Sequence, residues 1–487
     1  MDLLQQHHHD VGDIQDELIE WLKNRSPKDS EFGITLAKQK HVSNTVRENS
    51  YKSKGPRLGI NKLNRVLNVD KERKIVTVEP RVTMEQLVDA TLRHGLVPAV
   101  IPEFKSITVG GAINGTALES TSHRYGQFND ICTRYEVLIG DGAVIDITAE
   151  SHPDLFYGIS GSYGSLGIIL SVDIELIETS DWLLLDYHDF NSVEKAVQFM
   201  VEQHKSSTPP EYLEAITLSK DRTVVIAGNP IDNPSAYPKF SLSKTWDKWY
   251  YQHIHERFGG AVRQEAVKLR DYLFRQDRAG FWMGGYALHP LLLFRYILEY
   301  YGHIPKWLEP RDITKYHKVR MPSWWFRWFF GWMMDSERLY HIMHKGTEKW
   351  FAENFSIQDY YLPDDATVNF TEHVIKKYEI LPIWLCPMKA TKTGQLFSPH
   401  YLENGGSPLM FDVGVYGMAK DSISGELVVR DLDRLAANLG GKKMLYSYSY
   451  YTEEEFWKIY PNEPYQSLRE KYFASDVFLD ITKKVLN

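Results

Sequence analysis

The stretch PEFKSITVGGAINGTALESTSHRYG, residues 102–126, decides the fold. Gly110 and Gly111 follow Thr108-Val109, Gly115 comes four residues later, and small or hydroxylated side chains fill most of the gaps. A backbone with few Cβ atoms lets a ligand come close and turns several N–H groups towards one point, as an anionic diphosphate requires. The pattern is neither the G-x-G-x-x-G of a dinucleotide-binding βαβ unit nor a P-loop, because no Lys-Ser/Thr follows the last glycine. A tight structural turn is the alternative.

The segments on either side of these glycines predict a fixed order of elements. KIVTVEP (Lys74–Pro80) predicts a strand, and Thr83 with Gln86 predicts a helix that begins with a capping box and ends at a glycine. YEVLIGDGAVIDIT (Tyr135–Thr148) predicts a hairpin, because two apolar runs meet at Gly-Asp-Gly. A second glycine cluster, HPDLFYGISGSYGSLGII (His152–Ile169), then precedes a last strand, ILSVDIELIE.

This order resembles the FAD-binding domain of the p-cresol methylhydroxylase and vanillyl-alcohol oxidase superfamily, known as the PCMH type. Within it the chain is most similar to the delta-24 sterol reductase branch, through TVGGAINGTALESTSHRYG, NDICTRYEVLIGDG and DLFY. Three motifs outside the flavin domain support the same branch: FRQDRAGFW (Phe274–Trp282), PIWLCP (Pro382–Pro387) and MLYSYSYYTEEEFW (Met444–Trp457). The resemblance covers nearly the whole chain.

The resemblance implies an α+β fold with two parts. We expect the FAD-binding PCMH-type domain over residues 1–180 and a substrate cap with a mixed sheet over residues 181–487. The cap strands are expected at WLLLDYHDF, YLEAITLS, TVVIAGN, ILPIWLCP, LMFDVGVYGM and KKMLYSYSYY. A terminal helical region begins after Thr452 and is expected to pack back on the FAD domain.

The resemblance also implies the cofactor and its contacts, with FAD bound non-covalently. We expect the flavin contacts from Thr108, Val109, Gly110, Gly111, Ala112, Ile113, Asn114, Gly115, Thr116, Ala117, Leu118, Glu119, Ser120, His123 and Gly126. The first phosphate-facing loop of the superfamily falls at His41–Pro56, where Lys52, Lys54 and Arg57 either face the phosphates or form a solvated basic loop. His41 raises a covalent flavin link as an option, but a lone loop histidine is more often structural.

A flavin carries a hydride, and reduction of an isolated C=C bond also needs a proton at the second carbon. The resemblance implies a delta-24 sterol side chain, or a similar isoprenoid, as acceptor and NADPH as co-substrate, in steroid biosynthesis. No nicotinamide-binding fingerprint is visible, so NADPH is expected to visit the flavin transiently. Candidate proton donors or flavin partners are Glu103, His123, Tyr416 and Tyr448. An oxidase of a small alcohol or lactone and a non-catalytic flavin- or lipid-binding homologue remain the alternatives.

Composition excludes other classes of function. The chain has 487 residues and a net charge of -8, so nothing favours a nucleic-acid partner. It has two cysteines, Cys132 and Cys386, expected as lone core thiols, and no spacing typical of a metal site. We interpret residues 1–10, with His7 to His9, as a disordered polar start, followed by an amphipathic helix over Asp13–Lys23.

The segment 280–334 is unusually aromatic. Seven aromatic residues occupy the nine positions Trp324–Trp332, too many for one buried stripe. We expect either peripheral contact with a membrane surface or the mouth of an apolar substrate tunnel, with a buried aromatic core as the alternative. No apolar run suits a signal peptide or a transmembrane anchor, so the expected location is the cytoplasm.

Overall fold

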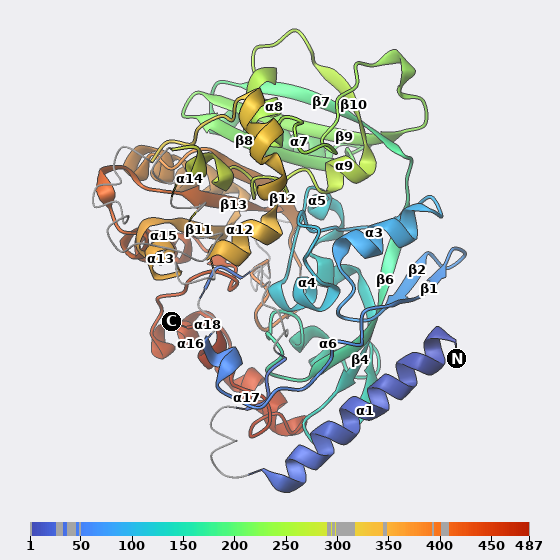
Figure 1. Cartoon of the computed structure of the whole chain (residues 1–487). Coiled ribbons are helices and arrows are strands. Elements are labelled where there is room, and N and C mark those ends of the chain that lie inside the picture. The colour runs from blue at the N-terminus through green and yellow to red at the C-terminus, as the bar shows by residue number, and fades with distance from the viewer. Residues whose placement is uncertain are drawn as a thin grey trace.

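The computed structural model describes residues 2–25, 33–36, 45–47, 50–289, 294, 298, 317–343, 348–391, 394–400 and 409–486. Two sheets organise these residues, one of six strands and one of eight. Figure 1 shows the smaller sheet in the lower half of the molecule and the larger sheet above it. The α+β class is therefore confirmed. Each ladder between the named strands is antiparallel, so the cap sheet that we expected to be mixed has antiparallel ladders in the described residues.

The six-stranded sheet has the order β1-β2-β6-β4-β5, with β3 paired to β6. Its strands are β1 (Val66–Asp70), β2 (Ile75–Val78), β3 (Leu96–Pro98), β4 (Cys132–Leu138), β5 (Val144–Ile147) and β6 (Ile168–Glu178). The helices and helical turns between them are α3 (Met84–Leu92), α4 (Val109–Gly115), α5 (Ser122–Tyr125), η2 (Phe128–Ile131) and α6 (Pro153–Gly158). The predicted hairpin is confirmed, because Tyr135 pairs with Ile147, and so is the capping box of Thr83 and Gln86.

The eight-stranded sheet has the order β10-β7-β9-β8-β12-β13-β11-β14. Its strands are β7 (Trp182–Phe190), β8 (Tyr212–Ser219), β9 (Arg222–Ile231), β10 (Gln264–Lys268), β11 (Ser356–Pro363), β12 (Ile383–Lys389), β13 (Leu409–Gly417) and β14 (Lys442–Lys443). The helices and helical turns of this part are α7 (Val193–Lys205), η3 (Pro234–Ala236), α8 (Tyr250–Arg257), α9 (Leu269–Leu273), η4 (Met283–Leu288), α11 (Trp324–Phe330), η7 (Gly331–Met333), α12 (Ser336–Met343), α13 (Glu348–Asn354), α14 (Asp364–His373), η8 (Val374–Tyr378), η9 (Lys420–Ser422) and α15 (Gly425–Asn438).

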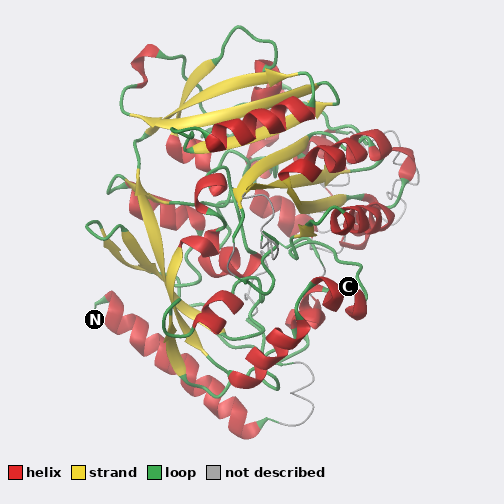
Figure 2. Cartoon of the chain, turned by 180° about the vertical axis from the view of Figure 1, so that it is seen from behind, coloured by secondary structure: helices red, strands yellow, loops and turns green. Residues whose placement is uncertain are grey.

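The two faces of the eight-stranded sheet differ in chemistry because successive strand residues point to opposite sides. One face presents aliphatic side chains such as Leu213, Val413 and Val415, which pack with residues of α7, α14 and α15. Figure 2 shows helices lying across this back face. The opposite face presents Glu214 and Asp412 among aromatic residues and packs in one core with the six-stranded sheet. We call this opposite side the inner face.

Both ends of the described chain pack on the six-stranded sheet. Helix α1 (Leu3–Asn24) runs along the lower edge of the molecule in Figure 1, where α17 (Asn462–Lys471) is drawn above its lower end. The helical turn η1 (Ser50–Ser53) follows α1 in the chain. The predicted cap at Thr452 begins α16 (Glu453–Ile459), and α18 (Ile481–Val485) ends the described chain. A shared apolar cluster joins α1 to strands and to the C-terminal segment: Val11, Ile14, Leu18, Leu138, Leu170, Val477 and Phe478. The division into residues 1–180 and 181–487 stays a prediction.

The strand expected at KKMLYSYSYY is much shorter than predicted. Lys442 and Lys443 pair with β11, and the N–H of Met444 donates to the carbonyl of Asp359 at 3.0 Å. Beyond Met444, side chains also bridge to that edge. The Ser447 hydroxyl donates to the carbonyl of Ile357, and the Gln358 amide donates to the carbonyl of Tyr448 at 2.7 Å. The two cysteines are free and buried, as expected.

The prediction of a disordered polar start is wrong, because residues 3–24 form helix α1 and His7 is only 2% exposed. The His7 ring lies between two carboxylates, 2.8 Å from Glu79 and 2.7 Å from Glu136. Burial alone would lower the pKa of His7, but the hydrogen bonds to Glu136 and Glu79 raise it to about 9. A buried imidazolium therefore fastens α1 to the six-stranded sheet.

This arrangement predicts how stability depends on pH. Because the folded-state pKa of His7 lies above the usual value of 6.5, its stabilisation is complete below about pH 6.5 and is lost as pH rises through about 9. We expect wild-type protein to lose on the order of 3 kcal/mol across that window, and His7→Gln to lack this loss. Urea unfolding at several pH values measures it. His9→Gln, which alters an exposed neighbour on the same helix, is the control and should keep the wild-type profile.

Candidate functional site

The predicted glycine run forms α4 and the loop that follows it. Thr108 is the N-cap, and its hydroxyl accepts from the N–H of Gly111 at 3.3 Å. The N–H of Gly110 donates to the carbonyl of Pro80, and a Cβ at Gly110 would lie 3.0 Å from the Pro80 ring. A Cβ at Gly115 would meet no atom within 4 Å, so that position borders open space. Gly110 therefore permits close backbone packing, and Gly115 leaves room for a ligand to approach the backbone.

The second glycine cluster lies directly against the first. The side-chain oxygen of Asn114 accepts from the N–H of Gly164 at 2.8 Å, and the N–H of Gly161 donates to the carbonyl of Ile113 at 3.3 Å. Gly161 and Gly164 both have φ near +72°, a conformation that favours glycine. A Cβ at Gly161 would also lie 3.1 Å from the methyl group of Thr116. The two clusters are one structural unit, which we call the glycine cradle (residues 108–116 and 160–167).

Cationic side chains surround this cradle. Lys484 on α18 donates to the carbonyls of Tyr163 and Gly164, each at 3.0 Å. The Arg47 guanidinium lies 4.5 Å from the centre of the Tyr163 ring and donates from Nε to the carbonyl of Lys484 at 2.7 Å. Burial, with Arg469 and Arg47 nearby, lowers the pKa of Lys484 to about 7. The cradle therefore carries positive charge next to backbone that approaches closely.

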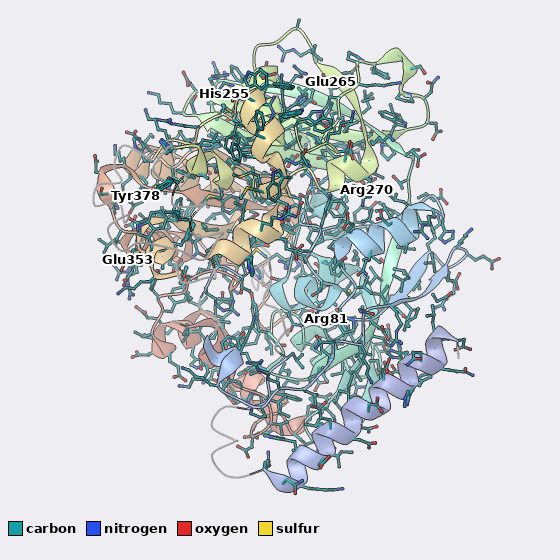
Figure 3. The ribbon with its side chains drawn as sticks, in the orientation of Figure 1. Arg81, His255, Glu265, Arg270, Glu353 and Tyr378 are labelled. Atoms are coloured by element: carbon teal, nitrogen blue, oxygen red, sulfur yellow. The ribbon has the colours of Figure 1, made fainter. Side chains whose placement is uncertain are left out.

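Two guanidinium nitrogens near the cradle are buried and lack a hydrogen-bond partner in the described structure. They are Nη2 of Arg47 and Nε of Arg81. Arg81 follows the proline that packs on Gly110, and Figure 3 shows it beside α4. Unpartnered buried donors of this kind are costly unless a ligand satisfies them. With the glycine backbone, they fit the diphosphate of FAD.

Acidic and phenolic side chains gather where the inner face of the eight-stranded sheet meets the segment between β3 and α4, which contains Glu103. The Tyr416 hydroxyl donates to the Asp359 carboxylate, and burial raises the pKa of Asp359 to about 6. Burial and the charge of Glu119 raise the pKa of Glu103 to about 8, and Glu103 also interacts electrostatically with Asp359. Asp412 is fully buried on the neighbouring strand β13. We call Glu103, Asp359, Asp412 and Tyr416 the acid group.

Comparison with known proteins agrees with this geometry. The FAD binding domain family matches residues 31–148. The chain is 27% identical to Delta(24)-sterol reductase of Homo sapiens, over 98% of this chain and 86% of the relative. It is 26% identical to Delta(24)-sterol reductase of Pisum sativum, over 96% of this chain and 83% of the relative.

These matches support a PCMH-type FAD-binding flavoprotein that is similar to the delta(24)-sterol reductase-like branch. A more distant flavoprotein, decaprenylphosphoryl-beta-D-ribose oxidase of Mycolicibacterium smegmatis, is 26% identical over 48% of this chain and 57% of its own length.

In this sterol reductase-like chain the predicted flavin contacts separate into three places. Thr108 to Thr116 form part of the cradle. Glu119 and Ser120 instead contact the buried guanidinium of Arg275. Local packing explains the glycine at position 126, because a Cβ there would lie 2.3 Å from the Asp130 carboxylate, which caps η2. The flavin contacts themselves remain predictions, and His41 lies outside the described residues.

The four predicted catalytic candidates do not lie together. Glu103 and Tyr416 are in the acid group and His123 is not, whereas Tyr448 packs in a neighbouring apolar cluster that includes Tyr446, a partner of Asp359. The His123 ring lies 5.9 Å from His204, and burial lowers the pKa of His123 to about 3, so its ring is neutral. Tyr448 stacks on Tyr450 at 6.3 Å and packs beside Val46.

Sequence reasoning missed an ion triad at the junction of the two sheets. Arg275, with 0% side-chain exposure, lies 2.9 Å from Glu119 and 2.7 Å from Glu214 on β8. Glu214 also accepts from the indole of Trp384 at 2.8 Å. Arg275 lies in the FRQDRAGFW motif. That motif supports the resemblance to the sterol reductase branch, but it does not indicate which residues pair with Arg275. Arg270, on α9 above α3 in Figure 3, adds a more exposed pair with Asp89.

The cradle predicts that FAD affinity depends on the charge of Lys484. A diphosphate favours the ammonium form, so affinity should be highest below about pH 7 and fall as pH rises above the apoprotein's pKa of about 7. We expect Lys484→Met to bind FAD at least about tenfold more weakly at pH 6, with a flatter pH profile. Titration of apoprotein with FAD measures this. Lys483→Met, which alters the exposed adjacent lysine, is the control; a Lys484→Met profile that keeps the wild-type slope contradicts the assignment.

Proposed function

We propose that this protein reduces an isolated C=C bond of a lipid, either the delta-24 bond of a sterol side chain or a similar isoprenoid olefin, with NADPH as electron donor. By its similarity to this branch, it is an FAD-dependent oxidoreductase. The carrying observation is that relatives named Delta(24)-sterol reductase match 96–98% of the chain, which includes the cap as well as the flavin half.

The inner face supports an apolar substrate. Phe281 lies 5.2 Å from Trp384 and 4.9 Å from Tyr416, ring centre to ring centre. Trp282 donates its indole N–H to the carbonyl of Tyr416 at 2.8 Å, which fixes this wall to β13. Such a wall favours an aliphatic chain and excludes water, which a hydride transfer requires.

The protein's part in the reaction is to orient the lipid and supply a proton. Bound FAD would supply the hydride chemistry, and the cradle residues would hold its diphosphate. Asp359, Asp412 and Tyr416 of the acid group lie on the same inner face as the aromatic wall, so a chain resting on the wall meets proton donors there. NADPH serves as a transient co-substrate in this proposal.

An oxidase of a small alcohol or lactone is the second candidate. The match to an enzyme named decaprenylphosphoryl-beta-D-ribose oxidase favours it, but that match covers 48% of the chain. A homologue that binds flavin or lipid without turnover is a third candidate.

The function is tested with purified protein whose bound flavin is recorded, mixed anaerobically with NADPH and then with desmosterol, a delta-24 sterol. We expect NADPH to bleach the flavin and the sterol to restore its colour while losing the double bond. Bleaching without reoxidation by desmosterol or other terminal isoprenoid olefins contradicts a reductase. Hydrogen peroxide formed from a small alcohol or lactone supports the oxidase, and flavin that NADPH never reduces supports the non-catalytic homologue.

We also propose that the aromatic helix α11 contacts a membrane surface, from which a lipid substrate would enter. Trp324, Trp325, Trp328, Phe329 and Trp332 are each between 45% and 64% exposed. Arg327, the charged residue of α11, instead points inward and donates to the carbonyls of Trp246 and Pro322. In water, a helix surface usually exposes its arginine and buries its tryptophans. A membrane interface instead favours exposed tryptophan side chains. No helix in the described part of the chain is both long and apolar enough to cross a bilayer.

Vesicle flotation tests this contact. We expect the double variant Trp325→Ser/Trp328→Ser to bind phosphatidylcholine vesicles roughly tenfold or more weakly. Each substitution removes an exposed indole, and with it apolar surface area that the membrane interface would bury. Leu427→Ser, which removes an exposed apolar side chain from α15, should bind like wild type. Equal binding of all three proteins contradicts the proposal. The expected cytoplasmic location remains a prediction.

A further inference from the structure

Asp412 is the least satisfied carboxyl group of the inner face. It is 0% exposed, and neither of its side-chain oxygens has a hydrogen-bond partner among the residues that the structure describes. Its strand position is opposite Tyr361 on β11 and opposite Cys386 on β12. A buried, unpartnered carboxylate would be very costly, so this carboxyl is held in its neutral, protonated form.

Asp359 lies nearby but has a different environment. It is opposite Gly414 on β13, two residues from Asp412 and on the same face of the sheet. The hydroxyls of Tyr416 and Tyr446 stabilise its charged form. Two carboxyls this close do not both ionise readily, so the negative charge resides on Asp359 and the proton on Asp412. Burial, followed by the charges of Asp359 and Glu103, raises the pKa of Asp412 well above its usual value.

Gly414 shapes the space in front of these two groups. A Cβ at Gly414 would lie 2.6 Å from the Tyr416 hydroxyl oxygen, so the tyrosine side chain folds back over this glycine. The ring is held there by Phe281 and Trp282. Other titratable side chains that interact with Asp412 are Tyr361, Cys386, Tyr416 and Tyr446.

An isolated C=C bond has no neighbouring carbonyl to hold negative charge. Hydride addition alone would leave a carbanion, so a proton must reach the other carbon before or together with the hydride. A neutral carboxylic acid is a far stronger acid than the phenol of Tyr416. Glu103 also retains a proton, but it bonds to its own backbone. Asp412 is the member of the acid group that combines a retained proton with two buried side-chain oxygens that lack any hydrogen-bond partner among the described residues.

We propose that Asp412 is the proton donor of the reaction, with the Asp359–Tyr416 pair as the charged partner that keeps the proton on Asp412. This inference rests on the proposed function. The O–H bond of Asp412 breaks as a C–H bond forms at one olefin carbon, and a hydride, which bound flavin would supply when reduced, accounts for the C–H bond at the other carbon. The two electrons of the π bond and the two of the hydride make these two bonds. The Asp412 carboxylate then regains a proton from water.

The first test needs no turnover. We expect infrared spectra of the holoprotein at pH 7 to contain a band from a protonated buried carboxyl that shifts when aspartate is isotopically labelled. The band should be absent in Asp412→Asn and present in Asp359→Asn. Because aspartate labelling leaves glutamate bands unshifted, labelled wild-type protein distinguishes the carboxyl band of Asp412 from that of Glu103 even if a variant fails to fold. No aspartate-sensitive band of a protonated carboxyl in labelled wild-type protein overturns the inference.

The second test separates the two half-reactions. In Asp412→Asn, NADPH should reduce the flavin at the wild-type rate, whereas reoxidation by the olefin should slow by about 10² to 10⁴-fold. Tyr416→Phe should slow reoxidation less, because it removes a partner of Asp359 rather than the donor. Wild-type reoxidation in Asp412→Asn overturns the inference while leaving the proposed function intact. If wild-type reduced flavin reacts with no olefin, the proposed function itself fails, whatever the infrared result.

Discussion

The structure depends on one guanidinium, that of Arg275, which is buried between two carboxylates from different parts of the fold. Glu119 comes from the loop after the glycine run, and Glu214 comes from the inner face of the larger sheet. Removing one partner from a buried ion pair costs about 3–5 kcal/mol, because the remaining charge is left uncompensated. These bonds are directional, so they fix the position of the acid group relative to the cradle as well as holding the parts together.

The larger sheet shows how a strand can serve packing and chemistry at once. Alternation sends Val413 and Val415 into the helices behind and sends Asp412 and Tyr416 forward. The aliphatic back supplies the burial that stabilises the sheet, so the inner face can retain polar groups that would weaken an ordinary core. The free-energy cost of burying the Asp412 carboxyl is therefore offset by the burial of apolar side chains on the same strand, such as Val413.

Local signals in the sequence predicted much of the fold, and distant partnerships were missed. The glycine run, the Thr83 and Thr452 caps and the hairpin each depend on residues within a few positions. His7 was misread because its partners lie 72 and 129 positions away, and Arg275 lies 156 positions from Glu119. Glu103 and Tyr416 were named by residue type alone. An aspartate inside the apolar strand LMFDVGVYG was the available sign of Asp412.

The contact between Arg47 and Lys484 closes a loop of 437 positions. Lys484 in turn holds the carbonyls of the second glycine cluster, so the last described helix finishes a surface begun near the start of the chain. A ribosome adds Lys484 long after Arg47. The cradle therefore lacks one of its cationic side chains until Lys484 has been translated, however early its glycines are made. A shortage of flavin would therefore leave folded protein in which the buried donors of Arg47 and Arg81 lack a partner among the described residues.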